Sequence, residues 1–226
     1  MQKISSKPPP PRAILFDLDG TIVDSLLDIA NACNHCLELL GLPPRPIDDF
    51  RHLVGEGIPK LCQRAIGSTH PHLLGRLEEL MRARYRAVPL VHTAPYAGIE
   101  AVVESLVARG MPLGVLSNKP HELTVKVTAA FWTAQSFPWV QGYDGEAYRK
   151  PDPYHLLRYA NEQGIAPAEI WLVGDTPTDI ETARRAGANC IAVTWGFRPR
   201  GELEESGATW LIDRPHELLE FLSPAT

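Results

Sequence analysis

The chain is short of cysteine, has no excess of basic residues and contains no long apolar run. Its four cysteines among 226 residues are too sparse for the disulfide framework of a small secreted domain. Lys and Arg total 22 against 27 Asp and Glu, so the formal net charge is -5, which argues against non-specific binding to nucleic acid or anionic membranes. No stretch approaches the roughly 18 consecutive apolar residues of a transmembrane helix. We therefore expect a cytoplasmic protein that binds neither nucleic acid nor membrane, and whose partner is a small molecule.

The first half of the chain begins with a polar segment and one apolar strand. Residues 1–11 end in four prolines and lack the apolar region of a signal peptide, so they predict a disordered lead-in. Residues 13–16 are continuously apolar and predict a buried strand. From Ser25, a candidate N-cap, apolar residues recur at helical spacing as far as Tyr85. Residues 25–94 are therefore expected to form an all-helical domain.

The second half of the chain alternates helices with short apolar strands. Strands are expected at about 113–116, 137–140, 170–173 and 190–194, helices at about 99–107, 121–134, 153–163 and 178–186, and a last strand and helix at 209–222. This alternation predicts a mainly parallel sheet with right-handed crossovers and helices on both faces. We predict an α/β fold with a Rossmann-like core of about five or six strands, formed by residues 12–24 and 95–226. The helical domain, residues 25–94, is inserted after the first strand.

Polar side chains follow the predicted strands at the point where each strand ends. They are Asp17 and Asp19 after the first strand, Ser117 and Asn118 after the next, and Asp175 with Asp179 after a later one. Because parallel sheets bind ligands beyond the carboxyl ends of their strands, we expect these groups to share one site. Converging carboxylates repel one another unless a cation or a proton is present, and oxygen ligands suit a hard ion. The sequence therefore predicts a Mg2+ site that binds a phosphate.

Four short motifs make the chain resemble the haloacid dehalogenase-like (HAD) hydrolase superfamily from Arg12 onward. In order, they are Asp17-Leu18-Asp19-Gly20-Thr21, Ser117-Asn118, Lys150-Pro151, and Gly174-Asp175 with Asp179. Within the superfamily, segments 23–25, 117–120, 150–153 and 174–187 are most similar to phosphoglycolate phosphatases. The resemblance implies a Mg2+-dependent phosphatase that acts on a small phosphorylated metabolite, 2-phosphoglycolate. It also implies that the helical domain is a cap over the active site.

The resemblance assigns the chemistry to aspartates of the first and fourth motifs. It implies that Asp17 attacks phosphorus and forms an aspartyl-phosphate, while Asp19 protonates the leaving group and then activates water. The metal, Mg2+ with Mn2+ as the alternative, is implied to bind the Asp17 carboxylate, the Asp19 backbone carbonyl and Asp175. Asp179 is implied to support the site by orienting water on the metal or Lys150.

The other motif residues are implied to bind the phosphate group. The Ser117 hydroxyl, the Asn118 backbone amide and the Lys150 ammonium are expected around the phosphoryl oxygens, where charge is stabilised in the transition state. Thr21 of the first motif belongs to the same expected group. These assignments follow from the resemblance and not from spacing alone.

The segment 51–60 is the predicted site of substrate selection. Its Gly55-Glu56-Gly57 sequence precedes a helix with proline in the first turn, a pattern that exposes backbone amides to an anion. We expect Arg51, Gly55 and Lys60 to contact the substrate's carboxylate when the cap closes. A plain turn at the start of a helix is the alternative interpretation.

Several alternatives accompany the phosphatase prediction. Dehalogenases of the superfamily lack the second aspartate of the first motif, so Asp19 argues against them. A sugar phosphomutase has the same motifs and stays open, whereas a noncatalytic phosphate-binding protein is disfavoured because every expected catalytic side chain is present. A monomer and a homodimer are equally compatible with the sequence. Thr178 and segment 195–198 depart from the usual family pattern at the expected edge of the pocket.

Overall fold

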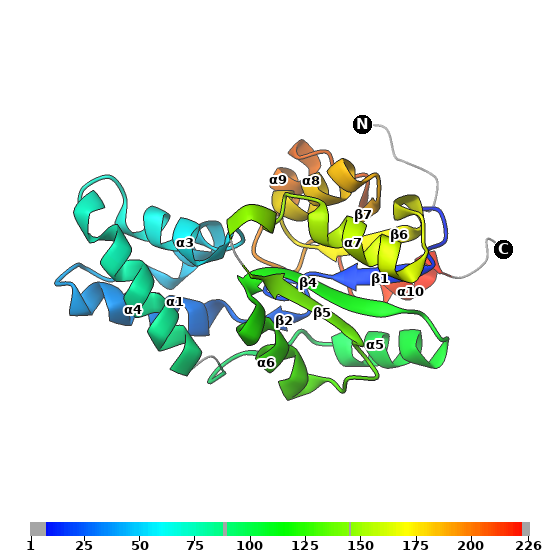
Figure 1. The fold of residues 1–226 in the computed structure, drawn as a ribbon, viewed down its shortest axis with the longest axis horizontal. Helices are drawn as coiled ribbons and strands as arrows, with labels where there is room; N and C mark the ends of the chain where they lie inside the picture. The colour runs from blue at the N-terminus through cyan, green and yellow to red at the C-terminus, as the bar shows by residue number, and fades with distance from the viewer. Residues whose placement is uncertain (1–7, 88–89, 145, 223–226) are drawn as a thin grey trace.

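The computed structural model describes residues 8–87, 90–144 and 146–222, which form a sheet-based part and a helical part (Figure 1). Residues 1–7 of the predicted lead-in lie outside the described residues. Pro8 and Pro11 are buried, and the carbonyl of Pro9 accepts a hydrogen bond of 2.8 Å from Trp171 Nε1. The proline run therefore packs against the sheet.

Six strands form the central sheet, in the order β5-β4-β1-β6-β7-β8, and every neighbouring pair is parallel. They are β1 Ala13–Phe16, β4 Leu113–Pro120, β5 Trp139–Tyr143, β6 Ile170–Gly174, β7 Asn189–Val193 and β8 Trp210–Ile212. All four residues of β1 are buried, because the strand lies at the centre of a sheet covered on both faces. This arrangement confirms the predicted Rossmann-like α/β core.

Helices cover the two faces of the sheet in two groups (Figure 1). Their bounds are α5 Ile99–Ala108, α6 His121–Phe131, α7 Tyr154–Gln163, α8 Pro177–Ala186, α9 Arg200–Glu205 and α10 Glu217–Phe221, with the short 3-10 helices η3 Glu146–Tyr148 and η4 Pro167–Glu169. Apolar side chains of α5, α6 and α10 share one hydrophobic cluster with the sheet. Those of α7, α8 and α9 share a second cluster on the other face. The crossovers thus produce the expected three-layer core.

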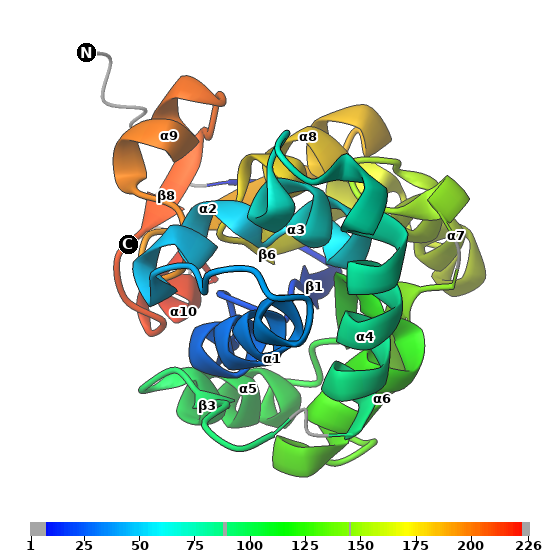
Figure 2. The same ribbon diagram turned by 90° about the vertical axis from the view of Figure 1, so that its left-hand side faces the viewer.

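The helical insertion lies at the end of the sheet where the strands finish and has its own hydrophobic core (Figures 1 and 2). Its elements are α1 Leu26–Leu39, η1 Ile47–Asp49, α2 Phe50–Leu53, α3 Gly57–Ile66, η2 Pro71–Leu73 and α4 Leu74–Ala87. Leu37, Phe50, Leu77 and Met81 are fully buried in it. Among residues 26–87 no strand is present, as the helical periodicity predicts. No helix in the described part of the chain is both long and apolar enough to span a bilayer.

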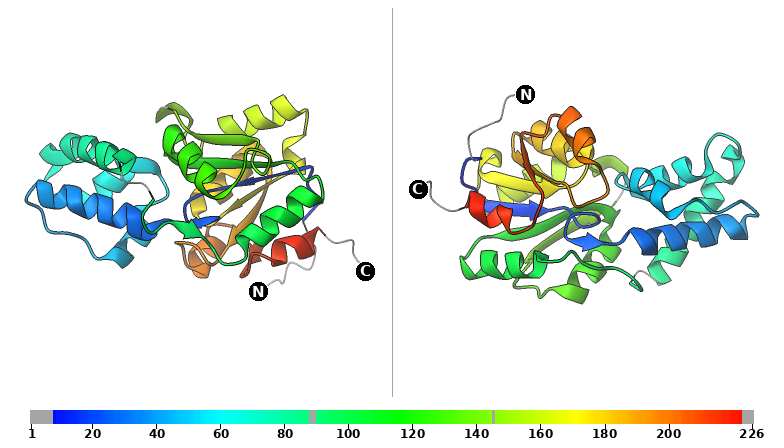
Figure 3. Two further views of the ribbon diagram at one scale, coloured as in Figure 1. Left: turned by 90° about the horizontal axis from the view of Figure 1, so that it is seen from below. Right: turned by 180° about the vertical axis from the view of Figure 1, so that it is seen from behind.

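A two-stranded antiparallel ribbon joins the insertion to the sheet (Figure 3). Its strands are β2 Val23–Asp24 and β3 Ala94–Pro95, which are too short to produce a periodic sequence pattern. Helix α9 was not predicted either, because Leu203 is its only buried residue. Strand β4 extends to Pro120, beyond the predicted end at residue 116, because pairing with β5 resumes at Pro120 after a register shift. Polar residues 117–119 therefore belong to the strand itself.

Candidate active site

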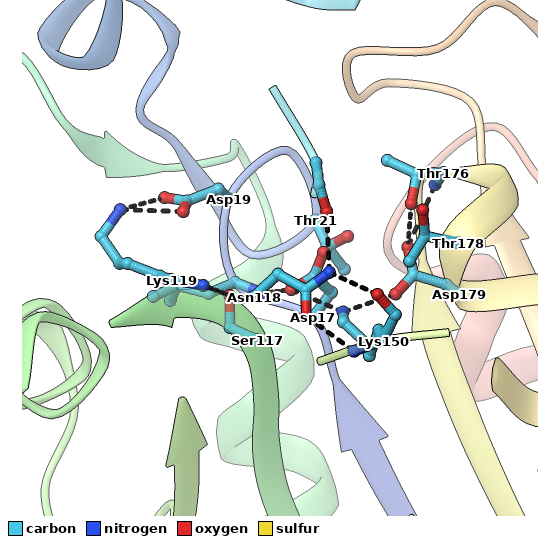
Figure 4. Close-up of polar contacts among 12 residues, drawn as sticks. Asp17, Asp19, Thr21, Ser117, Asn118, Lys119, Lys150, Thr176, Thr178 and Asp179 are labelled. Carbon is cyan, nitrogen blue, oxygen red and sulfur yellow. Dashed lines mark hydrogen bonds and ion pairs between the residues drawn. The ribbon is translucent and has the colours of Figure 1, made fainter. Parts of the chain in front are cut away.

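Lys150 links two carboxylates at the carboxyl end of the sheet (Figure 4). Its Nζ lies 3.0 Å from Asp17 Oδ1, just after β1, and 2.6 Å from Asp179 Oδ1 in the first turn of α8. Only 2% of the Lys150 side chain is exposed. Burial acts to lower the pKa of Lys150, but the charges of Asp17 and Asp179 outweigh it and raise that pKa above its usual value. The two carboxylates therefore favour the charged form of Lys150, and the structure brings these three predicted residues together.

Asp175, directly after β6, is completely buried beside this pair. Its Oδ1 accepts a hydrogen bond of 3.0 Å from Thr21 Oγ1, and its Oδ2 accepts one of 2.7 Å from the Phe197 amide. Burial, followed by the charges of Asp17 and Asp179, raises the pKa of Asp175 to about 8. Burial also raises the pKa of Asp17 to about 6, although Lys150 opposes this shift. The Lys150 ammonium thus offsets only part of the burial and repulsion at Asp17.

Three buried carboxylates form a group that fits a divalent cation. One oxygen from each of Asp17, Asp175 and Asp179 lies within 4.8 Å of the others. Carboxylate oxygens are ligands that Mg2+ and Mn2+ accept, and a cation would relieve the repulsion that raises the pKa of Asp175. The carboxylate of Asp179 already binds Lys150 and the amide and hydroxyl of Thr176. Asp17 and Asp175 therefore remain the better candidate ligands, in agreement with the expected metal site.

The Asp19 side chain points away from the cluster of the other three carboxylates (Figure 4). Its two oxygens lie 2.7 and 2.8 Å from Lys119 Nζ, and Oδ1 accepts a further hydrogen bond of 2.6 Å from Ser25 Oγ. Ser25 precedes α1 as expected, but its hydroxyl makes no capping hydrogen bond to that helix. Ser25 is therefore the N-cap residue as predicted, but its hydroxyl orients Asp19 instead of capping the helix.

Lys119 is a site residue that the sequence analysis missed. Its side chain is only 1% exposed, and its ammonium donates a hydrogen bond to the hydroxyl of Tyr85 on α4. The same ammonium lies 4.6 Å from the centre of the Tyr85 ring. Alternate residues of a strand face the same side, so the assignment of Ser117 contained a signal for Lys119. Lys119 connects the Asp19 carboxylate to the helical insertion.

Ser117 and Asn118 lie at the site but make different contacts. Asn118 Nδ2 donates hydrogen bonds of 3.0 and 2.9 Å to the carbonyls of Gly55 and Lys150, and Asn118 Oδ1 accepts one of 2.8 Å from the Lys150 amide. The Ser117 hydroxyl accepts a hydrogen bond of 3.3 Å from the Lys119 amide. The Asn118 side chain therefore fixes the segment before Pro151 and the insertion against β4. The phosphate contact expected of its backbone amide stays a prediction.

A pocket lies between the sheet and the insertion. Its lining comprises Asp17, Asp19, Ser117, Asn118, Lys119 and Pro120 from the core, and Ile29, Val54, Gly55, Gly57, Ile58, Leu61, Met81 and Tyr85 from the insertion. Polar groups therefore occupy the core side, and apolar side chains predominate on the insertion side. Thr21 is not among these lining residues, and its hydroxyl donates to Asp175. Its expected phosphate contact stays a prediction.

The three candidate selection residues of the insertion do not come together. Gly55 lines the pocket, where its carbonyl accepts the hydrogen bond from Asn118. Lys60 is exposed on α3, and its Nζ donates to Gln63 Oε1 at 3.2 Å. Arg51 is half exposed outside the pocket lining and donates to the Gly196 carbonyl at 3.2 Å. Of the three, only Gly55 is placed to contact a ligand in the pocket.

The fold and the site define a Rossmann-like α/β protein that has buried carboxylates at the carboxyl end of its sheet, next to a helical insertion. The family model for haloacid dehalogenase-like hydrolases matches residues 14–193, and the chain belongs to this family. It is 35% identical to the phosphoglycolate phosphatase of Chromobacterium violaceum, over 93% of this chain and 96% of the relative. It is 32% identical to the phosphoglycolate phosphatase of Aquifex aeolicus, over 93% of this chain and 96% of the relative.

A solved structure shows the same fold. A protein from Lactobacillus delbrueckii subsp. bulgaricus superposes with a TM-score of 0.89 at 27% sequence identity, covering 96% of this chain and 100% of that chain. Together with the phosphatase relatives, this similarity identifies the protein as a phosphoric monoester hydrolase. The prediction of an enzyme of this class is confirmed.

Proposed function

We propose that the protein hydrolyses 2-phosphoglycolate through an aspartyl-phosphate intermediate, with Mg2+ as cofactor. The observation that carries the substrate assignment is the 31 to 35% identity to phosphoglycolate phosphatases over more than nine-tenths of the chain. The observation that supports the mechanism is the placement of Asp17, Lys150 and Asp175 in one buried site. Neither the substrate nor the mechanism follows from family membership alone.

Asp17 is the proposed nucleophile. One of its carboxylate oxygens forms a bond to phosphorus while the bond from phosphorus to the glycolate oxygen breaks. The departing oxygen keeps the bonding electrons and takes a proton from Asp19. Water then attacks the aspartyl-phosphate and gives a proton to Asp19, which releases inorganic phosphate and restores both carboxyl groups.

Asp19 lies close to this reaction because it is two residues after Asp17 and lines the same pocket. Ser25 and Lys119 hold its carboxylate at 2.6 to 2.8 Å. A side chain held by two contacts keeps a fixed orientation, which favours proton transfer to a bound ester. Asp19 is therefore the proposed general acid and base.

The proposed metal site uses the Asp17 and Asp175 carboxylates and the Asp19 backbone carbonyl, with Mn2+ as an alternative to Mg2+. The bound cation lowers the repulsion between an anionic nucleophile and an anionic phosphate. Lys150, the Ser117 hydroxyl and the Asn118 backbone amide are proposed to bind the phosphoryl oxygens. Asp179 positions Lys150 through their contact of 2.6 Å.

Two broader assignments belong to the same proposal. The separate hydrophobic cores of the sheet and of the insertion support a division into a core domain, residues 12–24 and 95–226, and a cap domain, residues 25–94. The enzyme is proposed to work in the cytoplasm as a monomer or homodimer, and light scattering distinguishes these two states.

The test measures inorganic phosphate released from a panel of phosphate monoesters in Mg2+ or EDTA. We expect metal-dependent release with a preference for 2-phosphoglycolate, and a loss of at least about 1,000-fold in Asp17→Asn, because that variant lacks the nucleophile. Asp49→Asn, an exposed change on the cap, is the matched control. Release that persists in Asp17→Asn contradicts the mechanism. Conversion of β-glucose 1-phosphate to glucose 6-phosphate without phosphate release favours the phosphomutase.

A further inference from the structure

The pocket contains the buried ammonium of Lys119, which is not the ammonium expected to bind the phosphate group. The expected phosphate contact, Lys150, is a different ammonium that binds Asp17 and Asp179. Among the described residues that line the pocket, Lys119 is the only cationic side chain. A buried ammonium is costly unless it has anionic partners, and Asp19 is the partner that the structure provides. The pocket therefore contains a second ammonium, beside Asp19, with which an anionic group of a ligand can pair.

Tyr85 adds a hydrogen-bond donor to the same place. Its hydroxyl oxygen accepts the hydrogen bond from Lys119, because an ammonium can only donate. No acceptor among the described residues takes the hydroxyl's own hydrogen. Burial, followed by the charges of Asp19 and Asp28, raises the pKa of Tyr85 well above its usual value. The phenol therefore keeps its proton and can donate a hydrogen bond to a ligand.

We infer that Lys119 and Tyr85 form the subsite that binds the second anionic group of the substrate, the carboxylate of a small phosphate monoester. This inference rests on the proposed function and names the residues that select its substrate. An ammonium has three N–H donors, so a substrate carboxylate binds Lys119 in place of one Asp19 oxygen. Asp19 then remains held by Ser25, with an oxygen free to face the ester.

The apolar part of the pocket lining disfavours a polyhydroxy substrate. Apolar side chains predominate among the lining residues of the insertion, and they include Ile29, Ile58 and Met81. These side chains have no group that hydrogen-bonds to the hydroxyls of a sugar. Because Tyr85 belongs to the cap and Lys119 to the core, a bound carboxylate contacts both parts and favours their closed arrangement. Selection through Lys119 replaces the expected selection through Lys60, which faces solvent.

The experiment compares 2-phosphoglycolate with ethyl phosphate, an ester of similar length that has a methyl group in place of the carboxylate. We expect Lys119→Met to lower the ratio of their kcat/KM values by about 100-fold, because a buried charge pair is lost. Tyr85→Phe, which removes only the hydroxyl, lowers the same ratio by about 5- to 10-fold. Both changes raise KM for 2-phosphoglycolate more than they lower kcat. Lys126→Met, an exposed lysine change on α6, is the matched control.

Direct binding separates substrate selection from a disturbance of Asp19. In an Asp17→Asn background, calorimetry measures the binding of 2-phosphoglycolate and of inorganic phosphate in Mg2+. We expect the added Lys119→Met change to weaken 2-phosphoglycolate binding by about 100-fold and phosphate binding far less. Equal weakening of both ligands overturns the inference, since Lys119 would then act only through Asp19.

The kinetic outcomes separate a failure of the proposed function from a failure of the proposed carboxylate subsite. A wild-type protein that hydrolyses neither ester overturns the proposed function and the inference with it. Hydrolysis of both esters with an unchanged ratio in Lys119→Met overturns only the subsite. A ratio that changes in Lys60→Met but not in Lys119→Met also overturns it, and restores the sequence-based expectation for the cap.

Discussion

Gly20 has no side chain, and this leaves space for Asp175 in the active site. It has φ +86°, and a Cβ at this position would lie 2.3 Å from Asp175 Oδ2. Because a non-bonded carbon atom cannot lie so close to a carboxylate oxygen, any side chain here would displace Asp175. The glycine of the first motif is therefore needed both for its backbone conformation and for the space beside Asp175.

The pair Gly20→Ala and Gly41→Ala separates these two requirements. Gly41 also has a positive φ, +72°, but a Cβ there meets no atom within 4 Å. We expect Gly41→Ala to lower the free energy of unfolding by about 1–2 kcal/mol through backbone strain alone. Gly20→Ala should cost more and also remove phosphatase activity, because Asp175 moves. Urea unfolding and phosphate release measure both effects, and equal behaviour of the two variants would contradict this account.

Among the elements, α1 is joined to the segment that returns from the cap by a single carboxylate. Asp28 accepts hydrogen bonds from the backbone amides of Val91, His92 and Thr93 and from the Thr93 hydroxyl, at 2.6 to 3.0 Å. Burial raises the pKa of Asp28, but these hydrogen bonds outweigh it and lower the pKa below its usual value. The ionised carboxylate therefore stabilises the folded state.

Replacement of Asp28 should weaken this connection in a pH-dependent manner. We expect Asp28→Ala to lower the free energy of unfolding by about 2–3 kcal/mol at neutral pH, since three backbone amides and one hydroxyl lose a charged acceptor. A lowered folded-state pKa gives stabilisation that is present above about pH 4 and is lost as pH falls further. The difference from wild type should therefore shrink below that pH in urea unfolding. Asp49→Ala, on the exposed surface of the cap, should show neither effect.

Two arginines connect α2 and the following turn to the loop after β7. Arg198, which is 7% exposed, donates from Nη2 to the carbonyls of Val54 and His52 at 2.9 and 3.4 Å. In the reverse direction, Arg51 donates to the carbonyl of Gly196. Segment 195–198, where the chain departs from the usual family pattern, thus contacts the cap directly. These bonds position the turn that contains Gly55.

Arg198→Met should release that turn. We expect amide hydrogens of residues 54–58 to exchange at least about 10-fold faster, because hydrogen bonds from a charged donor are lost. Arg200→Met is the matched control, since Arg200 contacts Asp213 and Glu204 within the core and no cap residue. Unchanged exchange in Arg198→Met, measured by mass spectrometry, would show that other contacts hold the turn.

At the scale of the whole molecule, the site is completed by segments that are distant in the chain. Asp17 follows the central strand, Lys150 precedes α7 and Asp175 follows β6. Burial and the repulsion between carboxylates raise the pKa values of Asp17 and Asp175. A divalent cation bound to the folded protein would offset that repulsion and oppose global unfolding.

Metal removal should therefore lower the thermal stability of the entire protein. At about 100 times its Kd, Mg2+ is expected to stabilise the folded state by about 2.7 kcal/mol, which raises the unfolding midpoint by roughly 5–10 °C. Calorimetric scans in Mg2+ and in EDTA measure the difference. Asp175→Asn should remove it, whereas Asp49→Asn should retain it. A midpoint that responds equally to Mg2+ in wild type and Asp175→Asn places the cation elsewhere.

The sequence predicted the features that depend on neighbours along the chain. The continuous apolar run at 13–16 indicated a central strand, and helical spacing in 25–94 indicated the helices of the insertion. Polar residues at strand ends indicated a common site, since parallel strands finish at one edge of a sheet. The strand and helix predictions are confirmed because hydrophobic periodicity reflects which face of each element is buried. The two-residue strands of the ribbon were too short to leave such a pattern.

Only the tertiary structure decided which side chains meet across the site. Thr21 donates to a carboxylate 154 positions away, and Lys119 bonds to Tyr85, 34 positions away. Lys60 follows the glycines of the cap in sequence but faces solvent on α3. Local pattern determines the type of each element and the side that it buries. The rotation and packing of one element against another determine which polar groups share the pocket, and these depend on contacts between distant parts of the chain.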